Sequence, residues 1–230
     1  MSPRRKIMNI RDTIRDTYDI LYTHFGPQQW WPAGSVYEMM IGAVLTQSTA
    51  WRNVERAIAS LGDRLAPEYI LSCSDEELSA LIRPAGFYRQ KSARLKTLTQ
   101  WYSRYGCDRL NVMKLPPQRV RGELLALNGI GRETADSIML YAFEIPIFEI
   151  DAYTRRLFTR LGLSLPKEYD GIQSMISSHL PHDSVLFNEY HALIVAQCKT
   201  FCRKSPLCGG CPLEKHCFEA NGLDKNPVMR

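Results

Sequence analysis

Residues 124–160 read LLALNGIGRETADSIMLYAFEIPIFEIDAYTRRLFTR, and the fold of the chain is decided by this stretch. Two apolar segments are joined by the turn NGIG at 128–131. Two glycines allow a tight turn with bare N–H groups, which suits close approach to a phosphate. An apolar, strand-like link at 146–150 then leads to a single acid, Asp151, at a predicted helix N-cap. The stretch therefore predicts an anion-binding turn followed by a carboxylate held at a fixed position.

Composition restricts the class of protein. A chain of 230 residues can bury one or two cores. Its net charge of +5 permits a polyanionic partner but also fits a solvated basic surface. We expect neither a membrane span, since no apolar run of about 18 residues exists, nor a signal peptide, since residues 1–16 are basic and amphipathic. Seven cysteines, four of them crowded near the C-terminus, favour a reducing cytosol and a metal site over disulfides.

Hydrophobic periodicity predicts helices along nearly the whole chain. They cover about 7–25, 36–45, 50–61, 74–81, 89–105, 118–126, 132 onward, 152 onward, 169–180 and 183–198. The polar turn at 46–49 is expected to cap the helix that follows it, and Ser74 with Glu77 forms a capping box. Lys91 and Arg94 are interpreted as part of a solvated face, with phosphate contact as the alternative.

The string LNGIGRETAD (127–136) resembles the helix-hairpin-helix of the endonuclease III (HhH-GPD) superfamily of DNA glycosylases. Asp151 stands where that superfamily keeps its catalytic aspartate, and the C-terminal cysteines resemble its iron–sulfur loop. The resemblance covers about residues 36–217 and is greatest to the endonuclease III-type 3-methyladenine glycosylases. It implies a base excision repair enzyme that acts on double-stranded DNA containing a damaged base. We expect a cytoplasmic monomer associated with a bacterial or archaeal nucleoid.

The resemblance also implies an all-α fold of two helical lobes with a cleft between them. One lobe, 28–130, is expected to end in the hairpin. The other combines residues 1–27 with 131–230 and carries the iron–sulfur loop at 198–217. This discontinuous arrangement is implied by the resemblance and not by periodicity.

The hairpin and the acid have separate expected roles. Gly129 and Gly131 would present N–H groups to a phosphate near the start of a helix, and Arg132 and Arg155 are assigned to the DNA backbone with them. A carboxylate beside a glycosidic bond stabilises oxocarbenium charge and takes a proton from the attacking water. Asp151 is therefore the predicted catalytic residue, although an N-cap alone explains its position equally well.

A polar turn and three tryptophans are candidates for handling an extruded base. Gln47 matches the family glutamine that enters the gap left by the nucleotide. Trp51 matches a position where alkylbase glycosylases place a pocket aromatic. Trp30 and Trp31 are adjacent, so their side chains diverge and at least one is a candidate to contact the base. The structural alternatives are a capping turn for Gln47 and core packing for the tryptophans.

Glu133 departs from the family pattern. Glycosylase/lyase members carry a lysine after GVGR, which forms a Schiff base with the sugar, whereas this chain reads GIGRETAD. A glutamate forms no imine, so we predict base removal without efficient β-elimination. A carboxylate near aromatic rings favours a cationic methylated purine, and Glu133 joins Asp151 among the catalytic candidates. A surface salt bridge is the alternative for Glu133.

Four cysteines form the pattern Cys202-x5-Cys208-x2-Cys211-x5-Cys217. Four thiolates can hold a [4Fe–4S] cluster, and zinc is the alternative. The first spacing is one residue shorter than usual in the family, and Cys198 is an alternative first ligand. The basic residues around this loop predict a structural and DNA-binding role.

Two rival functions stay open at this point. One is an endonuclease III-like glycosylase with lyase activity on oxidised pyrimidines, which would need an amine other than residue 133. The other is a non-catalytic module that only binds damaged DNA. Retention of an acid at position 151 argues against the module.

Overall fold

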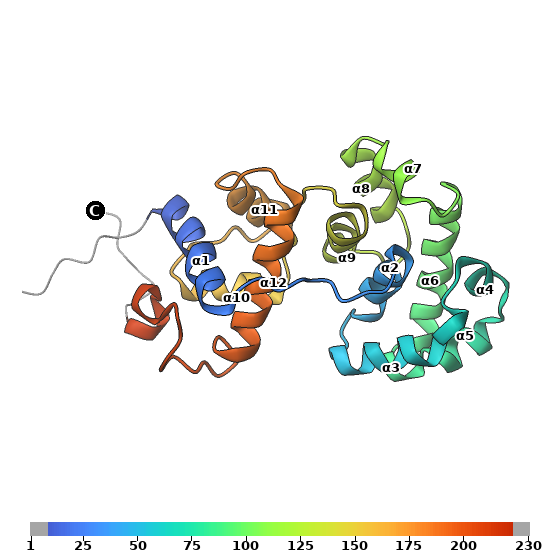
Figure 1. The fold of residues 1–230 in the computed structure, drawn as a ribbon, viewed down its shortest axis with the longest axis horizontal. Helices are drawn as coiled ribbons and strands as arrows, with labels where there is room; N and C mark the ends of the chain where they lie inside the picture. Colours follow the sequence, from blue (N-terminus) through green and yellow to red (C-terminus); the bar gives the residue numbers. More distant parts are fainter. Residues whose placement is uncertain (1–8, 223–230) are drawn as a thin grey trace, which may run out of the picture. The chain divides into compact units, whose positions relative to one another are not determined.

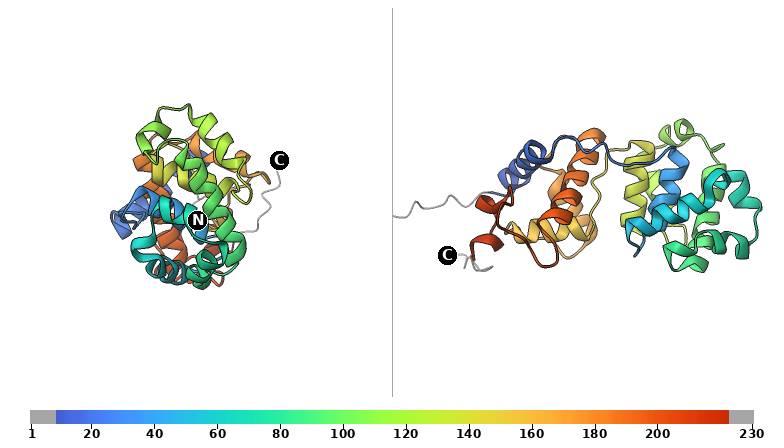
Figure 2. Two further views of the ribbon diagram at one scale, coloured as in Figure 1. Left: turned by 90° about the vertical axis from the view of Figure 1, so that its right-hand side faces the viewer. Right: turned by 60° about the horizontal axis from the view of Figure 1, so that its bottom comes forward.

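The computed structural model describes residues 9–222, which form helices joined by turns and loops without any β-strand in that range. The all-α prediction is therefore confirmed. The chain divides into two compact units (Figures 1 and 2). The central unit is Trp31–Pro146, and the terminal unit combines the described residues up to Trp30 with those from Ile147. Residues 1–8 and 223–230 of the predicted second lobe, including the start of the predicted first helix, lie outside the described residues.

The central unit is built around one apolar helix, α2. Met40, Ile41 and Leu45 on this helix are fully buried, and α2 contacts α3, α6, α9 and a π-helical turn. Burying such a continuous apolar surface is the main source of stability in a unit of this kind. The helices of the unit are α2 (Val36–Leu45), α3 (Trp51–Leu61), α4 (Pro67–Ser72), α5 (Asp75–Leu81), α6 (Tyr88–Ser103), α7 (Arg109–Met113), α8 (Pro117–Leu125) and α9 (Arg132–Ser137), followed by the π-helical turn Ile138–Ala142.

The terminal unit brings the two ends of the described chain together. Its helices are α1 (Ile10–Phe25), α10 (Ala152–Arg160), α11 (Tyr169–Ser177) and α12 (Ser184–Thr200). Helix α12 packs against α1 and α10, and the buried Tyr190 hydroxyl donates to the carbonyl of Ile14 at 2.6 Å. The segment after α12 carries two short 3₁₀ turns, Glu214–His216 and Glu219–Asn221.

The boundary between the two compact units lies at Pro146. Helix α9 follows the hairpin but packs against α8 and α2, so both hairpin helices belong to the central unit. The chain leaves that unit only where the apolar link 147–150 begins. The extended backbone of this link forms no sheet within residues 9–222.

Lys91 corrects the prediction of a solvated face on α6. Its side chain is fully buried, and its ammonium donates to the carbonyls of Leu45 and Ala85 at 2.8 Å and to Thr49 Oγ1 at 2.7 Å. Three acceptors satisfy its three donors, while burial lowers the pKa of Lys91 to about 8. The Thr49 hydroxyl thus accepts a hydrogen bond from Lys91 of α6. Helix α3 follows its N-cap Ala50 and has no side-chain capping hydrogen bond, in contrast to the cap expected from the turn at 46–49.

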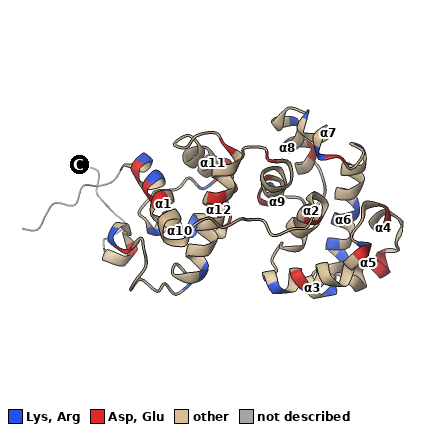
Figure 3. Ribbon diagram, in the orientation of Figure 1, with Lys and Arg blue, Asp and Glu red and all other residues tan. Residues whose placement is uncertain are grey.

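Charged side chains occur on helices of both units (Figure 3). The first turn of α5 is acidic, and Ser74 accepts a hydrogen bond from the backbone N–H of Glu77 there, as the capping box predicts. In the described part of the chain, every helix is too short or too polar to cross a membrane.

Candidate active site

Asp151 is the N-cap of α10 in the terminal unit. Its Oδ1 accepts a hydrogen bond from the backbone N–H of Thr154 at 2.7 Å, so the predicted cap is confirmed. Phe148 and Ile150 of the preceding link are buried, and they anchor the backbone on the N-terminal side of the acid. The Asp151 side chain is 12% exposed. An acid in this position is held by the backbone of its own helix.

A buried histidine lies beside Asp151. His191 on α12 places Nε2 at 3.6 Å from Oδ2 of Asp151 and Nδ1 at 3.8 Å from Oε2 of Glu149. Burial raises the pKa of Asp151, but the nearby charge of His191 and the hydrogen bond from Thr154 lower it more, so the net pKa is below its usual value. Asp151 is therefore a carboxylate at neutral pH.

The arginines of α10 bind backbone carbonyls of the terminal unit. Arg155 donates to the carbonyl of Lys167 at 3.5 Å. Arg156 donates to the carbonyl of Cys202 at 2.7 Å and lies over the ring of Tyr153. In this way α10 is attached to the segment that carries the cysteines.

The two hairpin glycines have different reasons for being glycine. Gly129 has φ +81°, and a Cβ there would lie 2.2 Å from Nε of Arg94. Gly131 is the N-cap of α9 with φ −87°, and a Cβ there would meet nothing within 4 Å. Ile130 between them is buried, whereas Arg132 and Glu133 in the first turn of α9 are exposed. The fold therefore requires a glycine at position 129, whereas a side chain at position 131 would meet only open space.

A salt bridge joins the two hairpin helices. Arg121 on α8 donates from Nε and Nη2 to the two carboxylate oxygens of Asp136 on α9, at 2.7 and 3.0 Å. Asp136 is fully buried, while the Arg121 side chain is 22% exposed. A two-point contact of this kind fixes the relative orientation of its partners.

Gln47 is bound to the hairpin. Its amide donates to the carbonyl of Gly129 at 3.0 Å and to Thr134 Oγ1 at 2.9 Å, and its carbonyl accepts from Nη1 of Arg94 at 2.6 Å. The structure thus brings the polar turn and the glycine turn together, as two predicted DNA-contacting elements of the central unit.

The adjacent tryptophans separate. Trp31 packs in the central unit, with ring centroids 5.3 Å from Trp51 and 5.4 Å from Tyr141. These three half-buried rings form an aromatic cluster. Trp30 belongs to the terminal unit, where its ring lies 5.5 Å from the Lys199 ammonium. The predicted divergence of the pair is therefore observed, and only Trp31 of the two joins Trp51.

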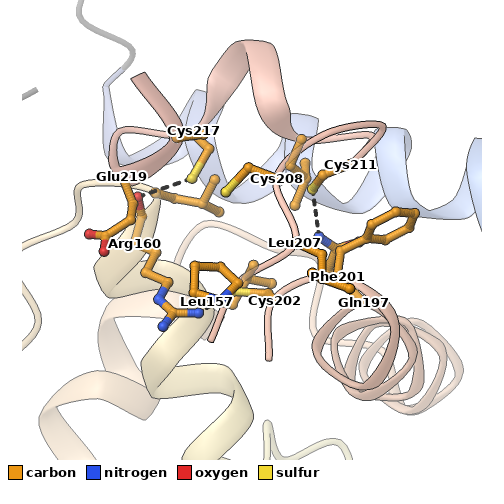
Figure 4. Close-up of a pocket in the computed structure, with 14 residues that line it drawn as sticks. Leu157, Arg160, Gln197, Phe201, Cys202, Leu207, Cys208, Cys211, Cys217 and Glu219 are labelled. Carbon is orange, nitrogen blue, oxygen red and sulfur yellow. Dashed lines mark hydrogen bonds between the residues drawn. The ribbon is translucent and has the colours of Figure 1, made fainter. Parts of the chain in front are cut away.

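The four C-terminal cysteines line one pocket in the terminal unit (Figure 4). It encloses about 350 Å³, including its open mouth. Two side chains donate to sulfur: Arg160 to Cys202 at 3.4 Å and Gln197 to Cys211 at 3.0 Å. Hydrogen bonding from Cys198 and then Arg160 lowers the pKa of Cys202 to about 6, against the opposing effect of burial. Across residues 9–222, no three potential metal ligands lie close enough together to bind a single ion.

Sequence reasoning missed four residues at these sites: Glu149, His191, Arg94 as a partner of Gln47, and Tyr141. Glu149 had a signal, because it is the one acid within the apolar link 146–150. A buried acid of that kind requires a partner. His191 lies in the apolar helix α12, and its nearness to residues 149 and 151 depends on tertiary packing. Periodicity alone does not predict that contact.

The sequence profile of the HhH-GPD superfamily of base excision DNA repair proteins matches residues 41–181. The chain belongs to the HhH-GPD superfamily. A Methanocaldococcus jannaschii protein, whose name describes an inferred DNA repair glycosylase, is 46% identical over 212 residues, which cover 90% of this chain and 96% of that protein. Endonuclease III of Thermotoga maritima is 28% identical over 184 residues, covering 79% and 82% of the two chains.

Two solved structures share the fold of this HhH-GPD protein. Endonuclease III in a trapped covalent intermediate with DNA superimposes with a TM-score of 0.79 at 23% identity, covering 94% of this chain and 99% of that one. The H. pylori 3-methyladenine DNA glycosylase bound to 1,N6-ethenoadenine gives 0.71 at 24% identity, covering 84% and 98%. The predicted superfamily is therefore confirmed, together with a fold that both branches share.

Proposed function

We propose that this HhH-GPD protein is a monofunctional DNA glycosylase that removes an extruded alkylated purine, such as 3-methyladenine, from double-stranded DNA. The observation that carries the proposal is Asp151, an N-capping carboxylate that is 12% exposed and whose pKa is lowered. Glu133 supports the monofunctional assignment, since a carboxylate stands where the lyase members carry an amine. Membership of a DNA glycosylase family makes an enzyme the better choice over a binding module.

The proposed reaction needs one anion near the sugar. The bond between C1′ and the base nitrogen breaks, its electron pair leaves with the base, and positive charge develops on the sugar. The Asp151 carboxylate stabilises that charge and accepts a proton as water forms its bond to C1′. A methylated purine is cationic and leaves as a neutral base, so no general acid is required.

DNA binding is assigned to the residues that the sequence indicated. The backbone at Gly129 and Gly131, with Arg132 and Arg155, would contact phosphates. Trp31 and Trp51 supply electron-rich rings for a cationic base, Trp30 is kept as a further aromatic contact, and Glu133 adds favourable charge. Gln47 would break its hydrogen bonds to Gly129, Thr134 and Arg94 and fill the gap that the extruded nucleotide leaves in the duplex.

We assign the cysteine pocket to an iron–sulfur cluster, with zinc as the alternative. Cys202, Cys208, Cys211 and Cys217 line one pocket and would hold the cluster through four thiolates. Arg160 and Gln197 donate to the thiolates and would offset their charge. When bound, the cluster would cross-link the loop through these four cysteines. Purified protein should contain iron and sulfide in equal amounts with visible absorption, and one zinc per chain would contradict this.

A panel of duplexes tests the activity. Duplexes bearing methylated purines, uracil, thymine glycol or adenine opposite 8-oxoguanine are incubated with protein and scored with and without alkali. We expect release of the methylated purine with strand breakage only after alkali. Asp151→Asn should abolish release while DNA binding persists, and the exposed Asp16→Asn should behave as wild type. Binding without release from any duplex would support the non-catalytic module.

A second experiment separates this function from a lyase. Incubation with an abasic duplex and borohydride should give no covalent adduct with the wild-type protein. The matched comparison is Glu133→Lys, which supplies an amine at the lyase position. A robust adduct with the wild-type protein would establish the endonuclease III-like alternative.

A further inference from the structure

Two buried side chains of the terminal unit, Glu149 and His191, lie beside Asp151 and have no role in the proposed function. We propose that His191 is a positioning residue: an imidazolium placed between two carboxylates, it keeps Asp151 ionised and oriented, while Glu149 holds the opposite ring nitrogen. This inference rests on the proposed function of Asp151 and deepens it.

The geometry of the ring supports this role. Nε2 faces Asp151 at 3.6 Å and Nδ1 faces Glu149 at 3.8 Å, so each nitrogen lies near a carboxylate. A neutral imidazole carries one N–H, whereas the imidazolium carries two and can serve both acids. The exposed fractions of His191, Glu149 and Asp151 are 5%, 6% and 12%. Two acids at such depth are costly without a cation between them, which favours the charged ring.

The two oxygens of Asp151 face different elements. Oδ1 accepts from the backbone of α10 at Thr154, and Oδ2 faces α12 at His191. Rotation of the carboxylate is restricted from both sides. Cys198, which is also on α12, interacts electrostatically with Asp151.

His191 transfers no proton in this scheme. Asp151 accepts the proton of the attacking water, and the imidazolium stays charged throughout. Loss of His191 should therefore slow base release and shift its pH dependence without weakening DNA binding. Because the pKa of Asp151 is lowered in the wild-type protein, its carboxylate persists to lower pH than an ordinary aspartate. Without the imidazolium, the acid limb of the rate profile should move to higher pH.

The kinetic test uses a duplex oligonucleotide methylated with dimethyl sulfate. His191→Gln should reduce the single-turnover rate of base release by roughly ten- to a hundredfold, the range found for residues that orient a reacting ligand. Affinity for undamaged duplex should not change. The exposed His182→Gln is the matched control and should behave as wild type. An unchanged rate and an unchanged acid limb in His191→Gln would overturn the proposal.

A second measurement does not depend on activity. Carbon-13 NMR of the Asp151 carboxyl in the free protein should give a lowered pKa in the wild type and in His182→Gln, and a higher pKa in His191→Gln. If His191→Gln fails to fold, nitrogen-15 shifts of the wild-type ring decide, because both nitrogens must be protonated at neutral pH. A neutral His191 ring overturns the inference. Absence of base release by the wild type, with these NMR results obtained, would reject only the proposed function.

Discussion

Gly129 and Gly131 belong to one turn but are constrained in different ways. The backbone of Gly129 is in the left-handed region at φ +81°, and the side chain of Arg94 occupies the space that a Cβ would need. Gly131 has an ordinary φ of −87° and open space around it. A methyl group at position 131 would therefore not disturb the fold. It would stand where the proposed phosphate approaches the N–H groups of the turn.

Paired alanine substitutions separate these two constraints. Gly131→Ala should unfold at the wild-type temperature but bind duplex DNA more weakly. Gly129→Ala should lower the free energy of unfolding by about 1–2 kcal/mol from the left-handed backbone alone, with further loss from displacing Arg94. Thermal unfolding and fluorescence anisotropy with a labelled duplex measure the two effects. Equal stability losses in the two variants would contradict the distinction.

At the scale of elements, the hairpin is held by the Arg121–Asp136 pair between α8 and α9. Removing one partner leaves the other charge poorly solvated, which costs about 3–5 kcal/mol when the site is buried. Arg121 is 22% exposed, so water can partly compensate its charge when Asp136 is lost. Losing Arg121 is the more severe case, because Asp136 is fully buried.

A double-mutant cycle tests the coupling across the hairpin. Arg121→Met should lower the free energy of unfolding in urea more than Asp136→Leu does. Arg121→Met with Asp136→Leu should be more stable than the sum of the single effects, because no buried charge remains. Strictly additive losses would show that the pair contributes no coupling between α8 and α9.

The cysteine segment docks onto the end of α10 through a second glycine contact. Gly162 has φ +97°, and a Cβ there would lie 3.1 Å from Cβ of Phe218. The thiol of Cys217, next to that phenylalanine, donates to the carbonyl of Arg160 at 3.4 Å. Contact between Gly162 and Phe218 therefore positions the last cysteine of the pocket.

Gly162→Ala should separate the cysteine segment from α10. Strain at positive φ combines with the clash against Phe218, so we expect lower iron content in purified protein and greater proteolysis after α12. Gly209→Ala is the matched control, since a Cβ there would meet nothing within 4 Å. Iron retention equal to that of the control would exclude this role for the glycine.

At the scale of the whole molecule, acid stability depends on Glu123, a carboxylate of the central unit that has no part in the proposed chemistry. Glu123 on α8 accepts hydrogen bonds from Tyr105 at 2.5 Å, Trp101 at 2.8 Å and Arg119 at 2.9 Å. The bond from Tyr105, followed by those from Arg119 and Trp101, lowers the pKa of Glu123 to about 2 despite burial. The unfolded chain binds a proton at this residue more readily than the folded chain does.

The sign of the pH effect follows from that difference. The contribution of Glu123 to stability is complete above its unfolded pKa, about 4.3, and is lost as pH falls toward about 2. Glu123→Gln should lower the unfolding temperature at neutral pH and flatten its decline across this acid window. The exposed Glu76→Gln serves as control. If the unfolding temperature of Glu123→Gln declined with falling pH as steeply as that of the wild type, the assignment would be contradicted.

Sequence patterns predicted the helices other than α4 and α7, the hairpin, the cap at Asp151 and the family, because those depend on local spacing and turn chemistry. They did not predict contacts between distant segments. Lys91 was expected on a solvated face, yet it is fully buried and donates to acceptors in residues 45–49 and at Ala85. The packing of α9 on α2 places both hairpin helices in the central unit, and no local signal reveals that contact. His191 came near Asp151 only through the packing of α12 on α10.

The division at Trp30 and Pro146 has a consequence for biosynthesis. The ribosome completes every helix of the central unit while α1 still lacks α12, its main partner in the terminal unit. Since domains fold as units during translation, the central unit can form first and the nascent α1 must wait. Cofactor loading into the cysteine segment would then be among the last steps of maturation.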